Sequence, residues 1–256
     1  MLITQLLPIA KRAANAIMAI YQQPFEIEIK ADNSPLTLAD RESNDIITQE
    51  LTNIFPNIPI ISEENKLIEY NIRKNWTKCW LVDPLDGTKE FVKRNGEFTI
   101  NIALIENQIP IAGLIYVPAQ QQGYFAQQGS GAFKIDSSDK IIPITIAKLD
   151  PTKPLKIVAS RSHPSPETTH YIETLQQEHA AGIEYISAGS ALKFCLVAQG
   201  DAHCYPRFAP TMEWDTAAGH IIATEAGANL AIYPQATPLT YNRPNLLNPY
   251  FLLKTW

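Results

Sequence analysis

The pattern of hydrophobic and polar positions predicts two halves that are built differently. In residues 2–21, apolar side chains recur at helical spacing, which predicts an amphipathic helix packed on the body of the protein. Between residues 98 and 135, short apolar runs alternate with turn signals, as in an antiparallel sheet. We therefore expect residues 1–150 to form an α+β lobe that ends at a proline-rich boundary.

Residues 151–256 alternate strand and helix patterns instead. The apolar runs predict strands at 155–159, 183–186 and 202–205, with helices between them. Such alternation predicts an α/β lobe, in which ligand sites lie at the carboxyl ends of strands. The chain as a whole is thus expected to be a mixed α/β (α+β) protein.

One stretch combines a buried strand with two acids. The apolar residues 80–82 run directly into Asp83, and Pro84 and Gly87 predict that the chain then leaves the sheet in a tight turn that carries Asp86. Two carboxylates roughly 4 Å apart repel each other by about 4 kcal/mol at an effective dielectric constant of about 20, so protons or cations must neutralise them.

Oxygen ligands alone, including the Leu85 carbonyl, favour a hard cation such as Mg²⁺. The backbone amides of Gly87 and Thr88 could hold a phosphate oxygen beside it. A plain turn is the alternative reading. An EF-hand loop is excluded because its sixth and twelfth positions hold Thr88 and Arg94. The haloacid dehalogenase pattern fails at Leu85, and no Walker loop occurs.

Three more acidic sites lie near the ends of predicted elements. Glu63 and Glu64 follow a short apolar strand, and because side chains alternate across a strand, at most one should point into a site with Asp83. Asp40 and Asp215 each lie near a helix start, where an acid can simply cap the helix. The small residues 217–219 would let the helix that begins near Asp215 approach the sheet closely, which would bring Asp215 to a buried site.

Composition narrows the function classes. A net charge of −5 argues against binding a nucleic acid polymer, which requires clustered Lys and Arg. Three cysteines without a Cys-x-x-Cys pair are typical of a reducing compartment. The sequence has neither a convincing signal peptide nor a run of about 20 apolar residues, so we expect a cytoplasmic protein without an integral membrane segment.

Four motifs occur along the chain in this order: Thr37-x-x-Asp40, Glu63-Glu64, Asp83-Pro84-Leu85-Asp86-Gly87-Thr88 and Trp214-Asp215-Thr216-Ala217-Ala218-Gly219. Together they resemble the inositol monophosphatase superfamily of magnesium-dependent, lithium-sensitive phosphatases. The segments Lys89–Thr99, Ser160–His163, Gly189–Cys195 and Tyr205–Arg207 are similar to those of its bacterial bisphosphate nucleotidases.

The resemblance implies a layered αβαβα sandwich of the inositol monophosphatase/fructose-bisphosphatase type and a set of residue roles. Two or three Mg²⁺ ions would be held by Glu64 rather than Glu63, by Asp83, the Leu85 carbonyl, Asp86 and Asp215. Catalytic roles would fall to Glu64 and to Thr88 paired with Asp40. Substrate contacts would come from Gly87, Thr88, Ser160, His163, Ser190, Lys193, Arg207 and Asp215.

The implied reaction is removal of the 3'-phosphate from adenosine 3',5'-bisphosphate, with its sulfated analogue as a further candidate substrate, in sulfur assimilation. Two alternatives stay open: an inositol or sugar phosphate phosphatase of the same superfamily, and a metal-dependent anion-binding protein without turnover. The resemblance also leaves open a monomer or a homodimer, and a peripheral association with the cytoplasmic side of the inner membrane.

Overall fold

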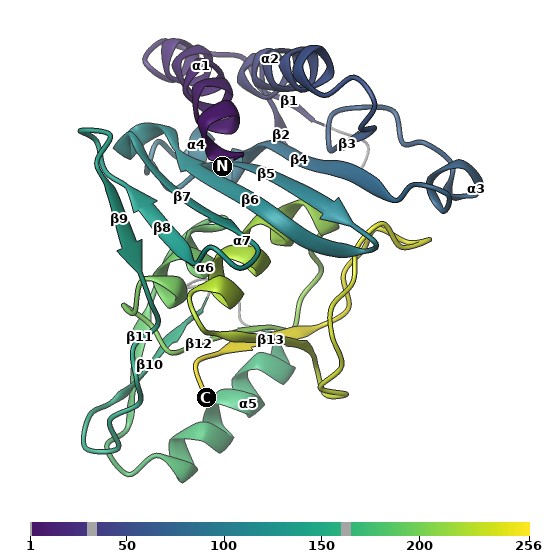
Figure 1. Ribbon diagram of the computed structural model, residues 1–256. Helices are drawn as coiled ribbons and strands as arrows, with labels where there is room; N and C mark the ends of the chain where they lie inside the picture. Colours follow the sequence, from purple (N-terminus) through teal and green to yellow (C-terminus); the bar gives the residue numbers. More distant parts are fainter. Residues whose placement is uncertain (1, 30–34, 160–164) are drawn as a thin grey trace.

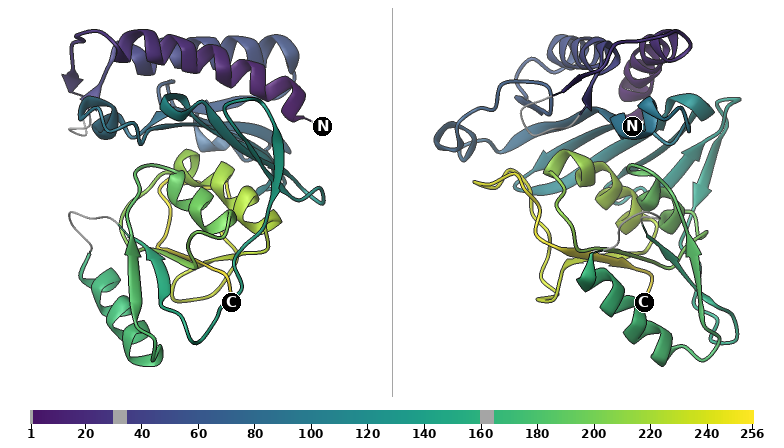
Figure 2. Two further views of the ribbon diagram at one scale, coloured as in Figure 1. Left: turned by 90° about the vertical axis from the view of Figure 1, so that its left-hand side faces the viewer. Right: turned by 180° about the vertical axis from the view of Figure 1, so that it is seen from behind.

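The computed structural model describes residues 2–29, 35–159 and 165–256. Their elements stack in five layers (Figures 1 and 2): two helices, a seven-stranded sheet, two more helices, a five-stranded sheet and a last helix. The outer pair is α1 (Ile3–Tyr21) and α2 (Leu38–Ile54), the inner pair is α6 (Leu192–Ala198) and α7 (Glu213–Glu225), and the last helix is α5 (Pro166–Glu178). The expected αβαβα arrangement is confirmed.

The first sheet has its strands in the order β3-β4-β5-β6-β7-β8-β9. Only β3 and β4 are parallel; every later pair is antiparallel, as the apolar runs predicted. The strands are β3 (Ile60–Ser62), β4 (Lys78–Asp86), β5 (Thr99–Glu106), β6 (Ile109–Val117), β7 (Gln122–Gln127), β8 (Ala132–Ile135) and β9 (Ile141–Ile144).

The second sheet is mixed, with the order β11-β10-β12-β14-β13. Its parallel part contains β10 (Leu155–Val158), β11 (Ile183–Ile186) and β12 (Cys204–Arg207), and its antiparallel part adds β13 (Asn229–Ile232) and β14 (Phe251–Lys254). The smaller elements are β1 (Glu28–Ile29), β2 (Pro35–Leu36), α3 (Tyr70–Arg73), α4 (Thr88–Val92) and the 3₁₀ turn η1 (Pro118–Gln120).

Alternation along β4 divides the core into two layers. Trp80 and Val82 are buried against the cluster that includes α1 and α2, whereas Leu81 faces the cluster between the two sheets. Each side chain position therefore belongs to a defined layer, and a residue at the end of β4 points either at the outer helices or at α7. None of the helices in the described ranges is both long enough and apolar enough to cross a lipid bilayer.

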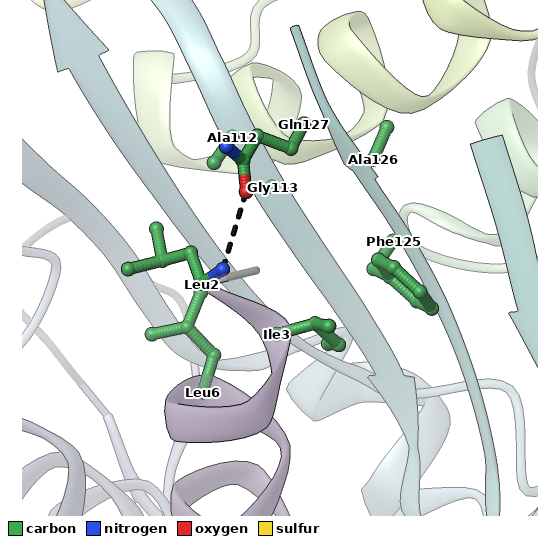
Figure 3. Close-up of a pocket in the computed structure, with 8 residues that line it drawn as sticks. All are labelled: Leu2, Ile3, Leu6, Ala112, Gly113, Phe125, Ala126 and Gln127. Carbon is green, nitrogen blue, oxygen red and sulfur yellow. Dashed lines mark hydrogen bonds between the residues drawn. The ribbon is translucent and has the colours of Figure 1, made fainter. Parts of the chain in front are cut away.

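The start of α1 is fastened to the first sheet. The backbone N–H of Leu2 donates to Gln127 Oε1 at 3.1 Å, beside a cavity lined by Leu6, Ala112 and Phe125 (Figure 3). This cavity has a volume of about 10 Å³, which is at most the space of one water molecule. It is a packing gap and cannot hold a substrate.

Small residues allow α7 to lie directly on the sheet, as the sequence predicted, but only some of them face the sheet, while Gly219 faces a neighbouring helix. A Cβ added at Gly113 of β6 would lie 2.9 Å from the Ala218 Cα and 2.6 Å from Ile221 Cγ2. A Cβ added at Gly219 would instead lie 2.3 Å from the Phe194 ring on α6. Ala218 therefore meets the sheet, while Gly219 admits the neighbouring helix.

We predict that Gly113→Ala lowers the free energy of unfolding by about 1–3 kcal/mol, because the added methyl group overpacks the contact between β6 and α7. Urea unfolding measures the change. Gly123→Ala on β7 is the matched control, since its nearest neighbour would be a Tyr116 side-chain atom at 3.2 Å, a much less severe contact than those at Gly113. Equal losses in the two variants would contradict the close contact at Gly113.

Candidate active site

A bulge in β4 brings Asp83 and Asp86 to the same face of the sheet. Asp83 pairs with Asn101 and Asp86 pairs with Thr99, so three steps along β4 match two steps along β5. In a regular strand, residues three apart point to opposite faces, and the one extra residue restores the same face. The strand therefore continues to Asp86, whereas the sequence predicted that it ends at Asp83.

Pro84 explains where the bulge forms. Proline has no N–H to donate to the ladder and is tolerated at bulges. The free Pro84 carbonyl accepts from Ser43 Oγ at 2.7 Å, and the Leu85 N–H donates to Asp83 Oδ1 at 3.1 Å. Asp83 is only 1% exposed, so its carboxylate is held against the backbone of its own bulge.

Three carboxylates from distant parts of the chain converge here. Glu63, Asp83 and Asp215 each place a carboxylate oxygen within 4.8 Å of the others. Glu63 follows β3, Asp83 lies on β4 and Asp215 lies in the first turn of α7. Distances of this size allow one cation to contact all three, so this acidic triad could hold a metal ion.

Glu63 is the glutamate that the structure brings within reach of Asp83 and Asp215, whereas the resemblance implied Glu64 as the ligand. The Glu63 N–H donates to the Val82 carbonyl at 3.2 Å, so the parallel ladder of β3 and β4 extends one residue beyond Ser62. Extending the register puts Glu63 beside Asp83, and neighbours in a parallel ladder share a face.

The gathered charges shift the acids toward their protonated forms. Burial raises the pKa of Asp83 well above its usual range, and the nearby Glu63, Asp86 and Asp215 carboxylates raise it further. Burial also raises the pKa of Asp215 to about 8, with Asp86 as the next cause. For Asp86 the pKa rises only to about 6, because Lys193 and a hydrogen bond from Asn101 oppose the effect of burial. A cation would replace these protons.

Asp40 joins two motifs. Thr37 is the N-cap of α2, and its N–H and hydroxyl both donate to Asp40 Oδ2 at 2.7 Å. The other oxygen, Asp40 Oδ1, accepts from Thr88 Oγ1 at 3.1 Å. Asp40 thus both caps its helix and contacts Thr88, so the two interpretations left open by the sequence are compatible.

A pocket of about 500 Å³ opens beside the acids, within the size range of small-molecule sites. Asp86 and Asp215 line it together with Lys193 and Arg207. The Lys193 ammonium donates to the Ser190 carbonyl at 2.9 Å and lies 5.7 Å from the centre of the Tyr205 ring. Lys193 lies on α6, and Arg207 lies at the end of β12 in the second sheet.

Arg207 has capacity left for a ligand. Its Nη2 donates to the Pro210 carbonyl at 3.1 Å, while its Nε is buried and has no hydrogen-bond partner among the described residues. An unpaired guanidinium N–H is costly to bury unless a ligand completes it. The pocket therefore places cationic hydrogen-bond donors, which suit an anion, next to an acidic triad that could hold a metal ion.

Ser190 fastens the wall of this pocket to the first half. Its hydroxyl lies 2.9 Å from the Asp86 carbonyl and 2.8 Å from the Glu97 carbonyl, so it can donate to either. Gly87, at φ +91°, leaves room for it, because a Cβ at that position would lie 2.0 Å from Ser190 Oγ. Gly87 lines the pocket and directly precedes α4.

Two of the predicted substrate contacts, Ser160 and His163, lie outside the described residues. The structure adds two residues that the sequence argument missed, Thr99 and Asn101 of β5. Asn101 Nδ2 lies 3.3 Å and Thr99 Oγ1 3.4 Å from Asp86 Oδ2, so they orient this carboxylate. A signal was present, since both polar residues interrupt an apolar run and both are buried.

The chain belongs to the inositol monophosphatase family, whose model matches residues 2–249. The chain is 43% identical over 253 residues to the 3'(2'),5'-bisphosphate nucleotidase CysQ of Escherichia coli strain K12, covering 98% of each chain. It is 36% identical over 262 residues to the CysQ of Haemophilus influenzae, covering 98% of this chain and 92% of that protein.

Solved structures show the same fold. The crystal structure of CysQ from Bacteroides thetaiotaomicron, a bacterial member of the inositol monophosphatase family, has a TM-score of 0.86 and 45% identity, covering 97% of this chain and 94% of that one. The suhB protein of Bartonella henselae has a TM-score of 0.80 at 23% identity, covering 99% and 93%, and supports the fold alone.

We predict that Glu63→Gln weakens divalent metal binding about tenfold or more, because it removes one carboxylate of the triad. Glu64→Gln is the matched control and should change the affinity far less. Titration with Mn²⁺ followed by electron paramagnetic resonance measures both variants without substrate. A larger effect of Glu64→Gln would reinstate Glu64 as the ligand.

The raised carboxylate pKa values also predict a pH dependence. A folded-state pKa above the unfolded value means that the folded state binds more protons, so stability is present at low pH and lost as the pH rises through the folded pKa. Without metal, unfolding in urea should become easier between about pH 4 and about pH 8. Mg²⁺ should restore stability most strongly at the upper end, and Asp215→Asn should flatten the metal-free dependence.

Proposed function

We propose that the protein is a Mg²⁺-dependent phosphatase that removes the 3'-phosphate of adenosine 3',5'-bisphosphate, giving AMP and phosphate. The observation that carries the proposal is an acidic triad beside a pocket whose lining includes the cationic residues Lys193 and Arg207, with Lys89 and Lys93 also on its wall. A substrate with two phosphates needs both features. The sulfated analogue has the same two anionic ends and belongs to the same proposal, as does a role in sulfur assimilation.

The donor set fits Mg²⁺. Carboxylate and carbonyl oxygens are hard ligands, and burial together with crowding raises the pKa values of Asp83 and Asp215, which is a cost that a bound cation would relieve. We propose that two or three ions would be held by Asp83, the Leu85 carbonyl, Asp86 and Asp215, together with Glu63 of the triad or the Glu64 that the resemblance implies. Bound Mg²⁺ would neutralise the phosphate charge and make water more acidic.

Asp40 and Thr88 serve to orient the attacking water. Because Asp40 Oδ1 accepts the Thr88 hydroxyl proton, an oxygen lone pair of Thr88 is left to accept a proton from water. Asp40 is 1% exposed and is held by Thr37, so the pair has a fixed direction. In-line attack on phosphorus then needs no phosphorylated side chain.

Lys193 and Arg207 are proposed to hold the 5'-phosphate that is not cleaved, and the backbone amides near Gly87 and Thr88 to hold the scissile one. The Arg207 Nε without a partner supports the first assignment. Ser190 would contribute by placing its loop, since its hydroxyl already donates to the first half. Binding at a remote anion orients the reacting phosphate.

Two other functions give different outcomes. An inositol or sugar monophosphate phosphatase would use the same triad but has no need of a second anion site. A metal-dependent binding protein would retain affinity without releasing phosphate. Lys193 and Arg207 in the pocket favour the bisphosphate over the first alternative.

We further propose a cytoplasmic protein, monomeric or homodimeric, with lobes at 1–150 and 151–256. Three buried free thiols, Cys79, Cys195 and Cys204, support a reducing compartment. The division into lobes is supported by the two sheets, which fall on either side of residue 150.

The test compares phosphate release from adenosine 3',5'-bisphosphate and from inositol monophosphate in the presence of Mg²⁺. Arg207→Ala should raise KM for the bisphosphate roughly 10–100-fold, because a charged hydrogen bond is worth about 1.5–3 kcal/mol, and leave KM for inositol monophosphate nearly unchanged. Asp83→Asn should remove most activity on both substrates.

An equal change in both KM values on Arg207→Ala would shift the assignment to the monophosphate phosphatase. Retention of most of the rate by Asp83→Asn would contradict the metal-dependent scheme. Tight binding without release under any divalent ion would favour the non-catalytic alternative.

A further inference from the structure

A segment near the C-terminus, with Asn242, Leu246 and Asn248 buried, packs against the start of α7. The segment Asn242–Asn248, here named the C-terminal clasp, belongs to the yellow stretch that runs from the second sheet toward the seven-stranded sheet in Figures 1 and 2. We propose that the clasp, through Asn248, is the device that positions Asp215 in the metal site. The inference rests on the proposed function, because it concerns the ligands of that same site.

The start of α7 has weak local means of holding its place. Its N-cap is Met212, whose side chain caps nothing by a hydrogen bond. Among the local bonds at this helix start, the Met212 N–H donates to Asp215 Oδ2 at 2.8 Å. The direction of the Asp215 carboxylate therefore depends on where the backbone of Met212 lies.

Asn248 holds the Met212 backbone and also contacts Thr211 and Thr216. Its side-chain Nδ2 donates to the Met212 carbonyl at 2.7 Å and lies 3.0 Å from Thr216 Oγ1. Its backbone N–H donates to the Thr211 carbonyl at 2.7 Å. One side chain thus spans the residues on both sides of Asp215, and it does so while 5% exposed.

The rest of the clasp holds the next residue of the helix. Glu213 is fully buried, and its carboxylate accepts from the Asn242 N–H at 2.5 Å and from the Arg243 N–H at 3.1 Å. The Arg243 guanidinium pairs with the same carboxylate at 3.0 Å and donates to Asn248 Oδ1 at 2.9 Å. The amide of Asn248 is therefore held at both its nitrogen and its oxygen.

Arg73 anchors the clasp to the first half of the chain. This residue ends α3 and is 1% exposed. Its Nη1 donates to Asn242 Oδ1 at 2.6 Å, and Asn242 Nδ2 donates to the Arg73 carbonyl at 2.9 Å. These contacts link the start of α7, which carries Asp215, to the half of the chain that carries Glu63 and Asp83, the other two members of the triad.

Asn248 lines no part of the substrate pocket, whereas Thr211, Asp215 and Thr216 do. It is therefore a positioning residue and touches neither substrate nor cation. The chemistry it serves is geometric, since ligand carboxylates that are not held in place by partners bind metal less tightly, typically by 10–100-fold.

The experiment measures Mn²⁺ affinity by electron paramagnetic resonance in the full chain without substrate, together with hydrogen exchange of residues 211–216 in the metal-free protein. Asn248→Ala should weaken Mn²⁺ binding about tenfold and speed exchange in that segment. Asn245→Ala is the matched control in the same clasp. Within the described part of the chain, its exposed side chain bonds only to the Leu247 N–H, at 2.9 Å, so both readouts should stay as in the wild type.

Asn248→Asp keeps the shape of the side chain and loses the donor to Met212, so it repeats the test if the alanine variant does not fold. A role confined to stability would lower the urea midpoint and leave the Mn²⁺ affinity of the folded variants unchanged, which would overturn the proposal alone. A wild-type protein that binds no Mn²⁺ would overturn the proposed function and this inference together.

Discussion

Repulsion between carboxylates is the constraint on which the rest of the structure depends. Glu63, Asp83 and Asp215 are brought within 4.8 Å of one another by a parallel strand pair and a helix start. Such a cluster opposes folding unless packing and hydrogen bonds elsewhere hold the elements in place. The close contact between Gly113 and α7, and the buried bonds of Glu213, supply that support.

Much of the architecture follows from local sequence, and the site follows in part. Hydrophobic spacing predicted the antiparallel strands and α1, because burial of one face governs both. The bulge after Asp83 was not predictable, since Pro84 is equally suited to a turn and to a bulge, and the register with β5 decides. The choice between Glu63 and Glu64 likewise depended on one ladder bond to Val82.

Residues that act at a distance left the weakest traces. Asn101 was recognisable only as a polar residue within an apolar strand, and Asn248 lies in a loop that showed no catalytic pattern. Both orient an acid that was predicted. Their partners, Asp86 and Met212, come from other elements of the fold, so no spacing along the chain could connect them.

The hydrogen bonds of the Ser190 hydroxyl have a consequence for which ligands the pocket selects. The Ser190 hydroxyl lies within 3 Å of the Asp86 and Glu97 carbonyls. It thereby joins the loop after β11 to the end of β4 and to the residues just before β5, beside the pocket. Because Lys193 in turn donates to the Ser190 carbonyl, these contacts restrain the distance between Asp86 and this cation. Ligands would then be selected first by the distance between their two anionic groups, and only afterwards by the identity of the base or ring between those groups.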